Sequence, residues 1–128
     1  MARNYEMRRV EFEALVESAL RKIPRRFRNA LQNIGIVVED WPDPALMAEV
    51  TGDREEVVYG LFTGRPLTER HYDDWGDLPA LIHIYQGPLE EDFPDHRELE
   101  REIEVTLVHE IAHYLGIDEE TLDKYGYG

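Results

Sequence analysis

Residues 109–113 read His-Glu-Ile-Ala-His and lie near the end of an apolar segment with helical spacing. On a helix, residues four positions apart lie one above the other on the same face, so the rings of His109 and His113 can bind one metal ion together. Zinc is the usual ion of such a pair. Glu110 lies one step round the helix, where it can handle a proton of a water at the metal. The pentapeptide therefore predicts a metal site.

The residues that follow the pentapeptide extend the pattern. Gly116 comes three residues after His113, and Glu119 comes three residues after Gly116. Glycine can end a helix in the left-handed conformation without a steric penalty, and such a reversal turns the next residues back towards the histidines. A carboxylate there would be a third ligand, and three protein ligands with one open position are typical of catalytic zinc. Glu119, Asp118 and no acid ligand at all remain three alternatives.

The eleven residues from His109 to Glu119 resemble the extended motif of the zincin metallopeptidases, H-E-x-x-H-x-x-G-x-x-(His or Asp). The short chain, the apolar strand before the helix and the Tyr-rich end are similar to the small bacterial zincin-like family, the mini-zincins. The resemblance implies one Zn2+ ion held by His109, His113 and Glu119, with Glu110 as the general base. The family has Asp where this chain has Glu119, so Asp118 stays as the alternative ligand.

The same resemblance implies a single zincin-like domain of the α+β class over residues 1–128. We expect a small mixed sheet of three to four strands, an active-site helix and two N-terminal helices. Hydrophobic periodicity predicts helices over 5–23, 24–33 and from about 95 to 115, a last helical turn over 118–125, and strands over 36–39, 55–62 and 81–86. Residues 41–44 and 63–79 are expected to form loops, and Gly87-Pro88 is expected to close the last strand.

Two expectations concern the surroundings of the metal. In zincins an edge strand binds the substrate by main-chain hydrogen bonds, and we expect the strand containing Leu81, Ile82, Ile84 and Tyr85 to take that role. The second half of the long helix is apolar almost all round, which predicts that the His-Glu-His residues lie in a buried, dry part of the helix. A transition state with an oxyanion needs a second stabilising group besides the metal. The candidates for that support are Tyr125, Tyr127 and His83.

Composition excludes several classes of protein and site. The chain has 128 residues, a net charge of −14 and no cysteine, so metal ligands must be His and carboxylate, and nucleic acid is disfavoured as a partner. We find no apolar run long enough to span a membrane and no apolar signal core at the N-terminus, so a cytoplasmic location is expected. A peptide or protein substrate is the expected partner. A homodimer is a further assembly that the sequence leaves open.

These observations lead to a main hypothesis and two alternatives. The main hypothesis is a zinc-dependent metallopeptidase that hydrolyses peptide bonds by Glu-assisted attack of a zinc-bound water. The first alternative is a non-catalytic zincin-fold binding or regulatory module. The second is a metal-dependent nuclease, which the acidity of the chain and Glu110 disfavour.

Overall fold

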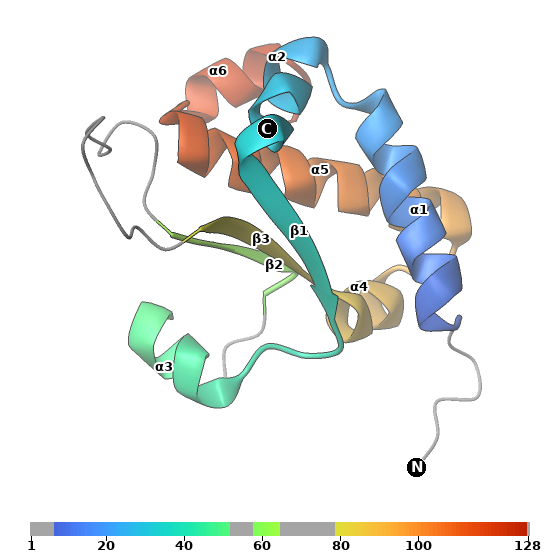
Figure 1. Cartoon of the computed structure of the whole chain (residues 1–128). Helices are drawn as coiled ribbons and strands as arrows, with labels where there is room; N and C mark the ends of the chain where they lie inside the picture. Colours follow the sequence, from blue (N-terminus) through green and yellow to red (C-terminus); the bar gives the residue numbers. More distant parts are fainter. Residues whose placement is uncertain (1–6, 52–57, 65–78, 128) are drawn as a thin grey trace.

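The computed structural model describes residues 7–51, 58–64 and 79–127, and these form a small sheet with helices packed on it (Figure 1). The α+β class, the mixed sheet and the two N-terminal helices are confirmed. In chain order the elements are α1 (Arg9–Lys22), α2 (Arg25–Arg28), the 3-10 helix η1 (Asn29–Asn33), β1 (Ile34–Glu39), α3 (Pro44–Thr51), β2 (Gly60–Thr63), β3 (Ala80–Tyr85), α4 (Gln86–Asp92), α5 (His96–Leu115) and α6 (Glu119–Lys124). No helix within these described ranges is long and apolar enough to cross a membrane.

The sheet has the strand order β1-β3-β2. Strand β3 runs parallel to β1, with Ile34 opposite Ala80, and antiparallel to β2, with Gly60 opposite Ile84. The expectation that residues 81–86 form an edge strand is therefore wrong, because the main-chain groups on both sides of β3 are used by its neighbours. In the described part of the chain, β1 and β2 are the edges.

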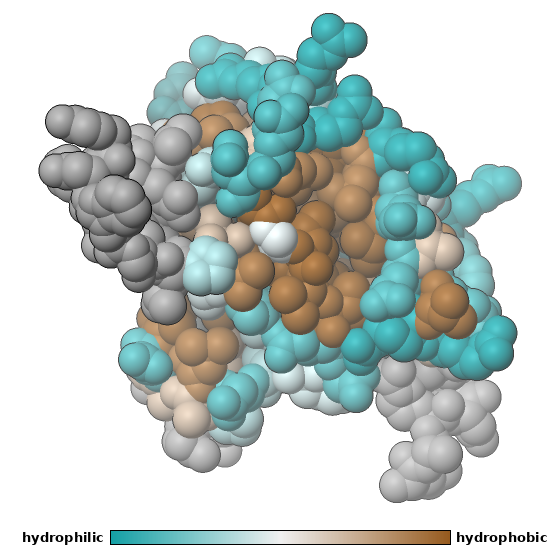
Figure 2. Space-filling model, in the orientation of Figure 1, coloured by the Kyte–Doolittle hydropathy of each residue, from teal (hydrophilic) through white to brown (hydrophobic). Residues whose placement is uncertain are grey.

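The hydrophobic core lies between one face of the sheet and the helices α1 and α5. Side chains alternate along β3, so Ile82 and Ile84 point to this core and are fully buried. They meet a stripe of buried residues on α1 and α5, namely Phe12, Val16, Ala19, Leu99, Ile103, Leu107 and Ile111. In the space-filling view, apolar side chains gather between β1 and α1 and hydrophilic side chains surround them (Figure 2). The packing places α5 across the sheet, next to both β3 and β2.

Two helices occupy stretches that the sequence pattern did not assign to helix. Helix α4 begins directly after β3, where Gly87-Pro88 was expected to end the strand in a turn. Pro88 fits because the first turn of a helix has N–H groups without helical partners. A side chain on Gly87 would come within 2.3 Å of the Trp41 ring, so this glycine is required for close packing. Helix α3 begins at Pro44, and the Asp43 carboxylate accepts a hydrogen bond from its second residue, Ala45.

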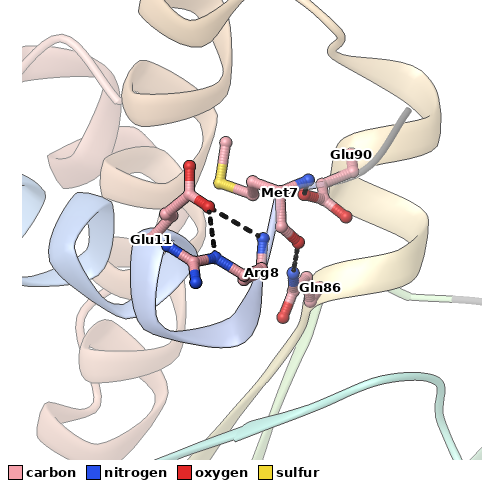
Figure 3. Close-up of polar contacts among 5 residues, drawn as sticks. All are labelled: Met7, Arg8, Glu11, Gln86 and Glu90. Carbon is pink, nitrogen blue, oxygen red and sulfur yellow. Dashed lines mark hydrogen bonds and ion pairs between the residues drawn. The ribbon is translucent and has the colours of Figure 1, made fainter. Parts of the chain in front are cut away.

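The main chain of Met7, just before α1, is hydrogen-bonded to two side chains of α4 (Figure 3). Met7 N–H donates to Glu90 Oε1 at 3.0 Å, and Gln86 Nε2 donates to the Met7 carbonyl at 3.1 Å. Arg8 Nε contacts Glu11 Oε1 at 3.0 Å, one turn further on. The helix expected from residue 5 thus begins at Arg9, while residues 5 and 6 lie outside the described part. The expected loop over 63–79 and the first residues of the strand expected over 55–62 also lie largely outside it.

Candidate metal centre and catalytic cleft

Helix α5 carries the motif residues and has a defined cap at each end. The Asp95 carboxylate accepts the N–H of Arg97 at 3.2 Å, which caps the N-terminus. Gly116 has a φ of +72° and ends the helix in the left-handed conformation, and Ile117 N–H donates to the Ala112 carbonyl across the reversal at 2.9 Å. The predicted helix and the predicted turn at Gly116 are both confirmed.

Glu110 is held by the main chain of the neighbouring strand. Its side chain is 14% exposed, and its Oε1 accepts the N–H of Phe62 in β2 at 2.9 Å. The same oxygen lies 3.5 Å from Nδ1 of His113. Burial raises the pKa of Glu110, while the charges of His113 and His109 and the Phe62 hydrogen bond act in the opposite direction. The structure therefore provides an oriented carboxylate beside two histidines.

The two histidines differ in their surroundings. The His109 ring is half-buried, and its Nε2 is hydrogen-bonded to the main-chain carbonyl of Tyr127. The His113 side chain is 65% exposed. The expectation that all three motif residues lie in a dry part of the helix is thus wrong for His113. Only one side of the last turn of α5 packs on the core, through Ile111 and Tyr114, and His113 lies on the other side.

A cavity of about 360 Å³ opens between β2 and α5 and contains two of the motif residues, His109 and Glu110. Its other lining residues are Val58, Tyr59, Gly60, Glu102, Val105 and Thr106. A side chain at Gly60 would lie 2.6 Å from Thr106 Cγ2, so the glycine lets β2 approach α5 closely. The Tyr59 hydroxyl is hydrogen-bonded to Asp92, which raises the pKa of Tyr59 to about 12. Sequence patterns did not indicate Tyr59, Gly60 or Phe62, because strand pairing across the chain brings them to the motif.

The acids after Gly116 do not complete a metal site in this structure. Asp118 caps α6, and its Oδ1 accepts the N–H of Thr121 at 2.9 Å, which lowers the pKa of Asp118. Glu119 lies exposed in the first turn of α6. Within residues 7–51, 58–64 and 79–127, no group of three His, Asp or Glu side chains is arranged to hold a metal ion. The structure places Glu110 near both histidines, and a metal site built on the two histidines and a third ligand stays a prediction.

His83 lies on the face of the sheet that points away from α5. It alternates with the buried Ile82 and Ile84, and its ring nitrogens contact Glu39 Oε1 at 2.5 Å and Thr63 Oγ1 at 3.0 Å. Leu81 and Tyr85 share that face with His83, and the Tyr85 ring stacks on the His83 ring. The structure therefore does not bring these β3 residues to the cleft, and His83 is not placed to stabilise a transition state there.

Neither tyrosine of the C-terminal segment directs its hydroxyl to the cleft. Tyr125 is 40% exposed, and its hydroxyl accepts a hydrogen bond from Arg26 at 3.0 Å. Tyr127 is buried, and its hydroxyl donates to Glu104 Oε2 at 2.5 Å. Burial and this hydrogen bond raise the pKa of Tyr127 to about 12. It is the main-chain carbonyl of Tyr127, and not its hydroxyl, that reaches the motif.

Comparison with known families agrees with this geometry. Residues 31–127 match the family model of the zincin-like metallopeptidases. The chain belongs to the zincin-like metallopeptidase family. The matched range contains all three strands of the described sheet, the cleft and the whole motif from His109 to Glu119. No curated protein sequence matches the chain.

Proposed function

We propose that this zincin-like protein is a zinc-dependent peptidase that hydrolyses peptide bonds in the cleft between β2 and α5. One observation carries the proposal: Glu110 is a desolvated carboxylate, oriented by the Phe62 N–H, beside His109 and His113 and facing a cavity. Burying a carboxylate is costly to a folded protein, and carboxylates with such perturbed surroundings concentrate at functional sites.

The donors present fit a zinc ion. His109 and His113 offer two imidazoles one helical turn apart, and zinc prefers nitrogen, sulfur and carboxylate donors. Glu119 is the proposed third ligand, because the Asp118 carboxylate is already used by the N-cap of α6. When bound, zinc supplies a Lewis acid that polarises a peptide carbonyl and makes water reactive near neutral pH.

Glu110 is the proposed general base and acid. A carboxylate accepts a proton from the attacking water and then donates it to the leaving amine. The burial that raises the pKa of Glu110 brings it closer to the working pH, where a group can both accept and release a proton. The Phe62 N–H holds one carboxylate oxygen, which leaves the other available to the water.

The outer edge of β2 is the proposed binding site for the peptide main chain, in place of the strand expected from the sequence. Tyr85 N–H donates to the Tyr59 carbonyl, and hydrogen-bonded pairs alternate along an antiparallel ladder. The main-chain groups of Gly60 and Phe62 therefore point away from β3; the Phe62 N–H is used by Glu110, and the Gly60 groups and the Phe62 carbonyl are left for a peptide. No strand among the described residues pairs with this edge. An extended peptide can add there as a further strand.

The variant Glu110→Gln tests the proposal. It keeps the size of the side chain and an acceptor oxygen for Phe62 N–H but removes the titratable group. We expect zinc content by metal analysis to stay at one ion per chain and hydrolysis of a mixed peptide library to fall about 10²- to 10⁴-fold. Glu98→Gln is the matched control, because Glu98 is exposed in the first turn of the same helix. Equal activity of both variants and the native protein would contradict the role of Glu110.

One observation favours a second candidate, a non-catalytic zincin-fold binding module. In the described part of the chain, no third ligand joins His109 and His113. This candidate predicts that the native protein cleaves no peptide of the library at any zinc concentration. The peptidase predicts that zinc-loaded native protein cleaves and that the chelated protein does not.

A further inference from the structure

The cleft that contains His109 and Glu110 continues along α5 towards the beginning of this helix. Glu102 lines the cavity of about 360 Å³ and also lines a second cavity of about 240 Å³. Positions 98, 102, 105 and 109 of a helix lie along one face, because their separations are three or four residues. The two cavities therefore meet at Glu102 on the same face of α5. The second cavity is lined by Phe93, Arg97, Glu98, Arg101 and Glu102.

The chain at β2 runs beside this face in the same direction as α5. Glu102 lies close enough to Tyr59 for its charge to contribute to the raised pKa of the Tyr59 hydroxyl. Three residues after Tyr59, the Phe62 N–H donates to Glu110 at 2.9 Å. An extended chain covers about 10 Å in three residues. A peptide that lies along β2 with its cleaved bond at Glu110 therefore brings a side chain about three residues away to Glu102.

The sides of the cleft around Glu102 are largely apolar. The Tyr59 ring lies edge-on to Phe93, with ring centroids 5.5 Å apart, and the Tyr59 hydroxyl donates to Asp92. These two contacts fix the Tyr59 ring at the side of the cleft. Val105 lines the same cavity from α5. A side chain with an aliphatic part can therefore lie against apolar surface before its end reaches the carboxylate.

The Glu102 carboxylate is available to a ligand. In the described part of the chain, no hydrogen bond or ion pair joins it to another residue. The neighbouring Arg101 is paired with Glu104 at 3.1 Å, and Arg97 lines only the second cavity. Among the described residues that line the larger cavity, none is Lys or Arg. Lys and Arg side chains place their CH2 groups on apolar surface and their charge at a polar end, so they match this arrangement.

We propose that Glu102 is a specificity-determining residue of the cleft, which selects extended peptides that carry Lys or Arg about three residues from the cleaved bond. The net charge of −14 supports the same substrate class, because a strongly acidic protein attracts cationic peptides over a distance. The proposal rests on the proposed function where cleavage is concerned. Binding of a basic peptide at Glu102 does not depend on hydrolysis and is measured separately.

Three variants and one peptide library test the selection. Glu102→Gln removes the charge and keeps the size of the side chain, Glu102→Lys reverses the charge, and Glu13→Gln is the control that removes one charge from the exposed face of α1. The library places Lys, Gln or Glu at each position in turn. For the zinc-loaded native protein and Glu13→Gln, we expect kcat/KM to be about 10-fold higher with Lys than with Gln at one position. This ratio should fall below about 2-fold in Glu102→Gln, and Glu102→Lys should prefer Glu there.

Fluorescence anisotropy with the metal-free proteins gives a readout that needs no cleavage. A labelled Lys peptide should bind the native protein and Glu13→Gln about 10-fold more tightly than its Gln analogue, with a difference that shrinks as salt is added. Glu102→Gln should bind both peptides alike. Circular dichroism checks that each variant is folded.

Separate outcomes contradict the two proposals. Equal affinity of the native protein and Glu102→Gln for the Lys peptide overturns the role of Glu102. A Lys preference that is the same at every position and unchanged in Glu102→Gln also overturns it, because the net charge alone would then be the cause. If the native protein binds the Lys peptide through Glu102 but cleaves nothing, the proposed function fails while the basic-peptide site stands. If it cleaves Lys and Gln peptides equally well, the peptidase stands while the role of Glu102 fails.

Discussion

A histidine lies beside a carboxylate on each side of the sheet, on the strands at the outer face and on α5 at the other, and the two pairs differ in how many of their polar atoms the protein uses. On the outer face, Glu39 and Thr63 engage both ring nitrogens of His83. On the face packed on α5, the His113 ring is 65% exposed, and Glu110 faces a cavity. A histidine with both nitrogens used by protein groups has no lone pair for a metal. Proximity of a histidine to an acid therefore does not by itself identify a metal site.

The carboxylates of the two faces differ in solvation as well. The Glu39 side chain is 45% exposed, whereas that of Glu110 is 14% exposed. Burial raises the pKa of Glu110, and the hydrogen bond that orients it comes from the main chain of β2. Desolvation and fixed orientation are the properties that a proton-transfer group needs. Glu110 therefore has the surroundings that the proposed proton transfer needs, whereas Glu39 forms a hydrogen bond between strands.

The strongest contrast between the faces is expected in metal binding. His109→Ala removes a proposed ligand on the α5 face, whereas His83→Gln changes the outer face and keeps a polar side chain for Glu39 and Thr63. We expect His109→Ala to lose at least about 100-fold in zinc affinity, more than the loss of a hydrogen-bonding partner of a ligand usually causes, and His83→Gln to retain one zinc per chain. Metal analysis after dialysis and dye competition measure both. If His83→Gln loses zinc but keeps a native thermal melt, the metal site lies on the outer face and not at α5.

A second contrast compares glycines on the two faces. A Cβ at Gly60 would meet Thr106 Cγ2 at 2.6 Å and the His83 carbonyl at 3.1 Å, whereas a Cβ at Gly35 would meet only the end of the Leu81 side chain, at 2.9 Å. Gly60→Ala should lower the free energy of unfolding by about 1–3 kcal/mol, because β2 must move away from α5. Gly35→Ala should change it by less than about 0.5 kcal/mol.

Urea unfolding of the metal-free proteins measures the change in the free energy of unfolding for both glycine variants. Peptide cleavage provides an independent check, because a shift of β2 also moves the Phe62 N–H that orients Glu110. We expect Gly60→Ala to lose activity and Gly35→Ala to keep it. Equal stability and equal activity of the two variants would show that the contact of β2 with α5 is not tight.

The smallest effect is expected for the outer-face hydrogen bond itself. Thr63→Val keeps the shape of the side chain and removes the 3.0 Å contact with Nε2 of His83. The free energy of unfolding should fall by about 0.5–1.5 kcal/mol, the usual net contribution of one hydrogen bond. Zinc content and peptide cleavage should stay native. A fall in cleavage that exceeds the loss of folded protein would show that the outer-face hydrogen bond contributes to activity.

Local patterns in the sequence predicted the parts of the site that lie on one element. The helix of residues 109–113 follows from its apolar spacing, and the reversal at Gly116 follows from the freedom of glycine to adopt a positive φ. Helices α3 and α4 were not predicted, because Pro44 and Gly87-Pro88 indicate turns and loops until packing decides otherwise.

The sequence by itself therefore determined the helix that carries His109, Glu110 and His113 and the turn that ends it, because hydrogen bonds between near neighbours decide such features. Only the tertiary structure decided that β3 is the central strand, that β2 lines the cleft, and that the Tyr127 carbonyl reaches His109. Strand order and the path of a chain end depend on contacts between residues far apart in the sequence. Their energies come from burial and pairing that no local pattern of residue types records.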